Sequence, residues 1–133
     1  MYMLDTDICI YIIKKRPGSV LRYFERLRPD EITMSSITFA ELMNGAKKSL
    51  RVEENIAKLN ELAEILEVKP FDRNAAIIYG NIRSALEKRG NIIGSYDLLI
   101  AAHAVSLDCI LVTNNEREFS RVDGLKIENW ATP

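Results

Sequence analysis

The stretch Met1-Tyr2-Met3-Leu4-Asp5-Thr6-Asp7 decides the fold that the rest of the chain follows. Tyr2, Met3 and Leu4 form a short apolar run, which is typical of a strand that is buried on both faces of a sheet. The run stops at two carboxylates, and the apolar residues 8–13 that follow predict a buried helix. Because ligands of open α/β sheets bind just beyond the carboxyl ends of the strands, this strand would deliver acid groups to the functional edge.

The two acids of this stretch have different ordinary explanations. Asp7 could simply cap the helix that follows it, which is a common use of Asp. Asp5 ends the strand and has no helix terminus of its own to satisfy, so we interpret it as a functional acid.

Composition limits the classes of protein that this chain can represent. Its 133 residues suit one domain, 1–133, and the 47% hydrophobic and 28% charged residues are typical of a globular protein. No apolar run approaches the roughly 20 residues of a membrane helix, and the N-terminus lacks the pattern of a signal peptide, so we expect a cytoplasmic protein. Cys9 and Cys109 stand among apolar neighbours and are predicted to be buried and reduced. The net charge of −1 means that any binding to nucleic acid must use local basic patches.

Strand and helix patterns alternate along the rest of the chain. Strands are predicted at 31–34 and 109–112, with a very short one near 69–71 and an edge strand at 125–127. Helices are predicted at 19–27 with Ser19 as N-cap, at 37–46, 52–68, 74–88 and 96–107, and as a short turn at 116–119. This alternation favours a parallel sheet with helices on both faces.

Three acids occupy positions where a carboxylate is costly. Asp5 ends the first strand, Glu41 lies in an apolar helix one turn before Gly45, and Asp97 lies in the first turn of the most apolar helix. A buried carboxylate without a partner is unfavourable, and three of them together would repel one another unless a divalent cation lay between them. Oxygen ligands favour Mg²⁺ or Mn²⁺ over zinc, and hydrated Mg²⁺ commonly acts on phosphates.

Four runs of sequence resemble a known family. MLDTD (3–7), ITFAEL (37–42), IGSYDLLIAAHA (93–104) and LVTNNEREF (111–119) are similar to the acidic blocks of PIN-domain ribonucleases, and most closely to the VapC toxins of bacterial VapBC pairs. The resemblance implies a three-layer α/β/α sandwich with a central parallel sheet of about five strands. It implies that Asp5, Glu41 and Asp97 form a Mg²⁺ site, which Mn²⁺ could also fill, and that the protein cleaves tRNA or another structured RNA. A VapB-type antitoxin is the implied partner, and we also expect a homodimer.

Two positions depart from the family pattern. Many members have Asn at the position of Asp7, and a fourth acid is common where this chain has Asn115. Asp7 and Asn115 are therefore weaker candidates for metal binding, and Glu116 and Glu118 lie near enough in sequence to substitute. His103 lies on a different helix face from Asp97, so we predict a structural role for it and a metal-activated water as the nucleophile.

Two other functions compete with the ribonuclease hypothesis. Asp5-x-Asp7 after a strand also matches the first motif of haloacid-dehalogenase-like phosphatases, although Cys9 and the absence of a late acid pair weigh against it. A catalytically silent PIN-like module that binds only RNA or a protein is the second alternative. Basic residues that could contact phosphates form short groups at Lys14–Arg16, Lys47–Arg51, Lys88–Arg89, Arg117 and Arg121.

Overall fold

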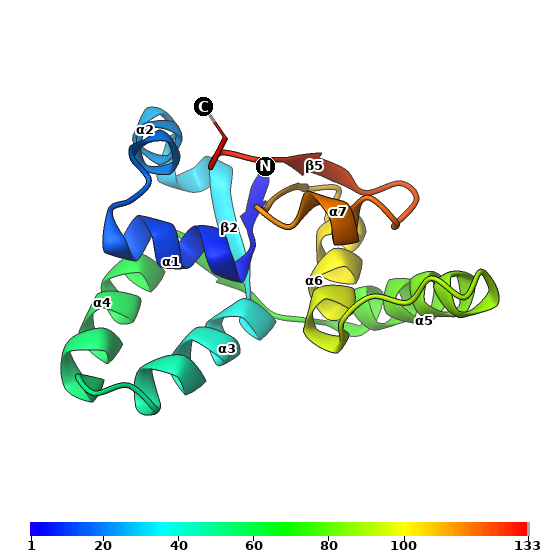
Figure 1. Ribbon diagram of the computed structural model, residues 1–133, viewed down its shortest axis with the longest axis horizontal. Helices are drawn as coiled ribbons and strands as arrows, with labels where there is room; N and C mark the ends of the chain where they lie inside the picture. Colours follow the sequence, from blue (N-terminus) through cyan, green and yellow to red (C-terminus); the bar gives the residue numbers. More distant parts are fainter. Residues whose placement is uncertain (133) are drawn as a thin grey trace.

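The computed structural model describes residues 1–132, which form one parallel five-stranded sheet between two layers of helices (Figure 1). The strands are β1 (Tyr2–Leu4), β2 (Ile32–Ser35), β3 (Glu67–Lys69), β4 (Ile110–Val112) and β5 (Lys126–Glu128), in the spatial order β3-β2-β1-β4-β5. The helices are α1 (Thr6–Lys14), α2 (Gly18–Arg26), α3 (Ser36–Lys47), α4 (Val52–Ile65), α5 (Arg73–Lys88), α6 (Ser95–Ser106) and α7 (Glu116–Phe119), with a 3-10 turn η1 (Pro29–Glu31). The predicted three-layer α/β/α sandwich is confirmed.

Neighbouring side chains of the central strands enter two separate cores. Met3 of β1 and Leu111 of β4 pack against α5, α6 and α7, whereas Leu4 and Val112 pack against α1, α2 and α4. Alternation of side chains along a strand produces this division, and the short apolar runs need no polar face because helices cover both sides. Figure 1 shows α1, α3 and α4 on one side of the central strands and α5 and α6 on the other.

The second helix begins differently from its predicted start. Pro17, rather than Ser19, occupies the N-cap position of α2, which starts at Gly18. Proline suits a helix entrance because its fixed φ matches the backbone there and its missing N–H would have no helical partner. Ser19 is instead buried, and its Oγ donates to the Ala131 carbonyl at 3.4 Å.

Two predicted boundaries near the edges of the sheet are also shifted. The helix predicted to continue through Val68 ends at Ile65, because Leu66 is extended and leads directly into β3. Helical and extended residues both present apolar side chains here, so periodicity alone does not mark the change. At the other edge β5 lies at Lys126–Glu128, one residue later than predicted, and the buried Trp130 follows it.

The strand order creates a crevice at the carboxyl end of β1. The chain leaves β1 toward β2 on one side and later returns to β4 on the other, which is the arrangement that opens a ligand site in open α/β sheets. The Asp5 N–H donates to the Val112 carbonyl at 2.9 Å, so the ends of β1 and β4 are locked together. Cys9 and Cys109 are buried free thiols, as predicted. None of the helices in residues 1–132 combines the length and apolar character needed to cross a membrane.

Candidate metal site and the adjoining cleft

Asp5 directly follows β1 and is also the N-cap of α1. Its carboxylate accepts hydrogen bonds from the Thr6 N–H at 2.8 Å and from the Thr113 Oγ1 at 2.7 Å, and the residue is 5% exposed. The expectation that Asp5 has no helix terminus to satisfy is therefore wrong, because α1 begins at Thr6 with no intervening turn. Capping uses part of its hydrogen-bonding capacity and leaves the carboxylate at the crevice.

Asp7 lies in the first turn of α1 and does not cap that helix. Its carboxylate accepts from the Ile8 N–H at 2.7 Å and from the Asn114 N–H at 3.1 Å. The second contact fastens the loop after β4 to α1. Burial raises the pKa of Asp7 above its usual value.

Asp97 and Glu118 form a second acidic pair opposite Asp5. Asp97 is half-buried in the first turn of α6, and its carboxyl group is within hydrogen-bonding reach of Glu118 on α7. The Asn115 Nδ2 donates to Glu118 Oε2 at 3.1 Å and lies 3.5 Å from Asp97 Oδ2, while Glu118 Oε1 accepts from the Gly94 N–H at 2.5 Å. The sequence named Glu116 and Glu118 together as possible substitutes for a fourth acid. The structure places Glu118 beside Asp97, whereas Glu116 accepts from the Asn129 Nδ2 at 3.1 Å.

Glu41 reaches the same region from α3. Its Oε1 accepts a hydrogen bond from the Thr6 Oγ1 at 3.0 Å, beside the Asp5 cap. The charge of Glu41 contributes to the raised pKa values of both Asp5 and Asp97. The structure therefore brings the three acids selected from the sequence into one electrostatic neighbourhood.

Asp5 and Asp97 hold protons more tightly than usual. Burial, followed by repulsion from Asp7, raises the pKa of Asp5 to about 7, and burial together with the charge of Asp5 raises the pKa of Asp97 to about 7. Glu118 differs, because the Gly94 N–H lowers its pKa. No ion pair within residues 1–132 involves Asp5, Glu41, Asp97 or Glu118. The charge of Arg121 acts on Glu118, but no basic side chain within residues 1–132 forms an ion pair with Asp5, Glu41 or Asp97. A divalent cation would supply the compensating charge for these three acids.

The donor set fits Mg²⁺ or Mn²⁺ in chemistry, because it consists of carboxylate, amide and hydroxyl oxygens. Across residues 1–132, no group of three Asp, Glu, His or Cys side chains is arranged so that it could hold a metal ion by itself. Mg²⁺ commonly binds through one or two carboxylates and retains several waters. Asp5 and Asp97 remain the predicted ligands, and a direct contribution from Glu41, Asn115 or Asp7 stays a prediction.

His103 lies away from the acids, as its helix face predicted. It is 1% exposed, and its Nδ1 lies 2.8 Å from the Ser35 Oγ at the end of β2. Burial lowers the pKa of His103, so the ring is neutral at physiological pH.

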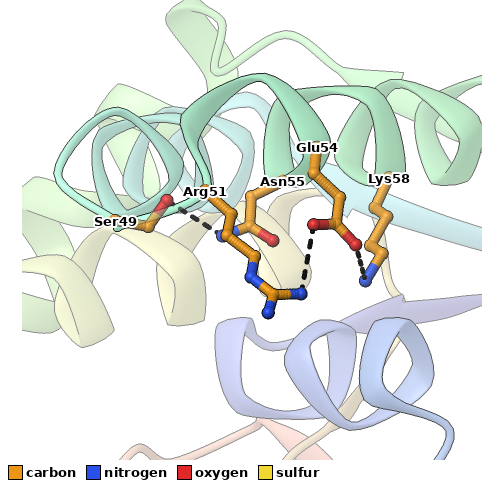
Figure 2. Close-up of polar contacts among 5 residues, drawn as sticks. All are labelled: Ser49, Arg51, Glu54, Asn55 and Lys58. Atoms are coloured by element: carbon orange, nitrogen blue, oxygen red, sulfur yellow. Dashed lines mark hydrogen bonds and ion pairs between the residues drawn. The ribbon is translucent and has the colours of Figure 1, made fainter.

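A cleft adjoins the acidic site between α1, α3 and α4. It has a volume of about 370 Å³ and begins at Thr6 and Glu41. Asn55 and Lys58 of α4 line it, and Figure 2 shows the polar contacts that hold them: the Asn55 Nδ2 donates to the Ser49 Oγ at 2.9 Å, and Glu54 bridges Arg51 at 3.5 Å and Lys58 at 3.4 Å. Its remaining lining is mostly apolar and includes Ile10, Ile13, Leu42, Gly45 and Leu59, with Lys14 and Lys58 at the rim. The sequence did not reveal this α1–α3–α4 cleft, because three separate helices build it.

The fold and the acidic crevice define a PIN domain, and the PIN domain family model matches residues 2–125. The chain is 45% identical over 131 residues to Ribonuclease VapC2 of Rickettsia felis, covering 98% of each protein. It is 44% identical over 129 residues to the tRNA(fMet)-specific endonuclease VapC of Salmonella typhimurium, covering 97% of each. The crystal structures of VapBC2 from Rickettsia felis bound to a promoter DNA fragment and of DNA-bound VapBC from Salmonella typhimurium superpose with TM-scores of 0.91 and 0.92. Each is 44% identical to this chain and covers 97% of it. The superposition covers 98% of the matched chain from Rickettsia felis and 97% of that from Salmonella typhimurium.

This chain belongs to the VapC ribonucleases of the PIN-domain family. The family membership predicted from four runs of sequence is therefore confirmed. The family match gives no support to the haloacid-dehalogenase alternative.

Proposed function

We propose that this protein is a Mg²⁺-dependent endoribonuclease toxin that cleaves tRNA or another structured RNA. One observation carries the proposal: Asp5, Glu41, Asp97 and Glu118 lie together at the crevice of a VapC-family fold, and no ion pair within residues 1–132 neutralises them. A silent module would gain nothing from this arrangement, because the repulsion among the acids disfavours the folded state.

The residues of the crevice have separable roles in this proposal. Asp5 and Asp97 would hold the cation, which supplies charge neutralisation at the scissile phosphate and a more acidic water. The Thr6 N–H and the Thr113 hydroxyl each bind one Asp5 oxygen and so fix the plane of its carboxylate. Glu118 has a lowered pKa and stays ionised, so it can orient a water or accept its proton.

The substrate class follows from the relatives. One relative with 44% identity over 97% of both chains is named a tRNA(fMet)-specific endonuclease. We extend tRNA cleavage to this chain and take initiator tRNA as the first candidate. Lys14, at the last residue of α1 and at the rim of the adjoining α1–α3–α4 cleft, is a basic residue available to contact a flanking phosphate.

A small antitoxin protein is the proposed partner. The relatives of known structure were solved as VapBC assemblies. The α1–α3–α4 cleft offers an apolar floor for a partner's apolar side chains, and Lys14 and Lys58 at its rim would attract acidic ones. At the Glu41 end, a basic side chain of the partner would form a charge-assisted pair with the acids and block the crevice. The homodimer and the cytoplasmic location stay predictions.

The test is cleavage of a purified tRNA pool that includes initiator tRNA, with the cut ends mapped by primer extension. Wild-type protein should cut in Mg²⁺ and stop in excess EDTA, and Asp97→Asn should not cut. Undiminished cutting in EDTA, or by Asp97→Asn, would contradict the proposal, and RNA binding without cleavage would support the silent module. Expression in cells should arrest growth, and the antitoxin encoded beside it should restore growth.

A further inference from the structure

His103 links the helix that carries Asp97 to the helix that carries Glu41. Its buried Nδ1 lies 2.8 Å from the Ser35 Oγ. Ser35 ends β2 and is the N-cap of α3, where its Oγ also accepts from the Ile37 N–H at 3.0 Å. Helices α3 and α6 are in contact, so this polar contact lies at the junction of the two acid-bearing helices.

A loop closes over the junction and completes the polar contacts of the ring. His103 donates to the Pro70 carbonyl, and the Phe71 ring packs edge-on against it with centroids 5.4 Å apart. The Phe71 N–H donates to the Ser36 Oγ at 3.0 Å. Because the Ser35 Oγ already accepts from a backbone N–H, its own proton is available to Nδ1, and the ring proton faces Pro70. Both ring nitrogens of His103 therefore have a polar partner.

The spacing of residues on the two helices connects this junction to the acids. Glu41 lies six residues after Ser35, and Asp97 lies six residues before His103, so each acid is about 9 Å of helix away from the junction. Both acids lie on the same side of the junction between α3 and α6, since the charge of Glu41 acts on Asp97. A rotation of about 5° at the junction would therefore move an acid by about 0.8 Å along its arc. A displacement of that size exceeds the roughly 0.5 Å tolerance of a functional site.

We propose that His103 is a positioning residue whose contact with Ser35 sets the separation of Asp97 and Glu41. The proposal rests on the proposed metal-dependent function of those acids. His103 acts through α3 and α6, and its contacts at the junction are with Ser35, Pro70 and Phe71.

Two substitutions separate positioning from simple packing. His103→Asn places a polar atom at the position of Nδ1 and can keep the Ser35 contact, but it leaves the larger cavity. His103→Gln fills more of the space and reaches toward Pro70, but it loses the Ser35 contact. The measurements are calorimetric Mn²⁺ affinity, urea unfolding, and amide hydrogen exchange in the first turns of α3 and α6 without metal.

We expect His103→Gln to weaken Mn²⁺ binding about tenfold or more, and His103→Asn to stay within about threefold of wild type although it is the less stable variant. Exchange in the two first turns should accelerate in His103→Gln only. Ser35→Ala, which keeps the ring packing, should reproduce the loss of affinity if a His103 variant does not fold. Affinities that follow stability, or wild-type affinity in His103→Gln, would overturn the proposal. If wild-type protein binds no Mn²⁺, the proposed metal-dependent function fails. Amide hydrogen exchange then still tests the positioning role of His103, which equal exchange rates in His103→Gln and His103→Asn would overturn.

Discussion

Replacing Asp5 by Asn should stabilise the metal-free protein at alkaline pH and leave it nearly unchanged in acid. Burial raises the pKa of Asp5 from 3.8 to about 7, which is roughly three units, or about 4 kcal/mol at about 1.36 kcal/mol per unit. Since the folded protein binds this proton more tightly than the unfolded chain, wild-type stability falls as pH rises from about 4 to about 7. Asp5→Asn removes the charge at the cost of about 1 kcal/mol for a weakened hydrogen bond to Thr6 or Thr113.

The expected gain in the free energy of unfolding is therefore up to about 3 kcal/mol at pH 8, and close to zero or slightly negative at pH 4.5. Urea unfolding in EDTA at both pH values measures it, with the exposed acid substitution Glu64→Gln on α4 as a control that should change neither value. Saturating Mn²⁺ at pH 8 should stabilise the wild type more than Asp5→Asn, because the ion binds only the folded site. An equal gain at both pH values, or no gain at pH 8, would show that the buried charge of Asp5 does not destabilise the metal-free protein.

Three further changes test other parts of the site. Asp97→Asn should lower the rate of RNA cleavage by at least about 100-fold, measured under single-turnover conditions, while circular dichroism shows a normal fold; near-wild-type cleavage would remove Asp97 from the site. Asn115→Asp should tighten Mn²⁺ binding without RNA, because the neutral amide beside Asp97 and Glu118 becomes a third carboxylate. Unchanged affinity in calorimetry would place residue 115 outside the metal shell. Gly45→Phe should place a ring in the α1–α3–α4 cleft, because Gly45 lines it and a Cβ there meets nothing within 4 Å. It should abolish rescue of growth by the antitoxin but spare cleavage, whereas Gly45→Ala should retain both, and full rescue of Gly45→Phe would place the partner elsewhere.

The sequence predicted the parts of this fold that depend on local pattern. The run Tyr2–Leu4 is apolar at every position because helices cover both faces of β1, and the helix predicted at 74–88 is observed as α5, Arg73–Lys88. Asp5 and Asp97 were identifiable because an acid next to a buried run has few ordinary explanations. The capping role of Asp5 was not identifiable, because composition does not show that a strand turns into a helix without a loop.

Features that are formed by segments far apart in the chain could not be predicted from the sequence. The sequence offered Glu116 and Glu118 as equal substitutes for a fourth acid, and only the contacts of Glu118 with Asn115 and with the Gly94 N–H, twenty-four residues earlier, distinguish the two. The α1–α3–α4 cleft and the contact between His103 and Ser35, sixty-eight residues apart, have the same origin. Helical periodicity reveals which face of a helix is buried, but it does not reveal which other helix that face meets.

Calorimetric titration of Mn²⁺ into the metal-free protein at pH 8 tests the central claim, that the crevice between Asp5 and Asp97 holds a divalent cation. We expect one well-occupied site in the wild type, whose affinity falls by at least about tenfold in Asp97→Asn and stays unchanged in the exposed control Glu64→Gln. We also expect weaker binding at pH 6, where Asp5 and Asp97 still carry protons because their pKa values are raised to about 7. Binding of equal strength in wild type and Asp97→Asn, or no binding to the wild type, would show that Asp5 and Asp97 do not hold a divalent cation.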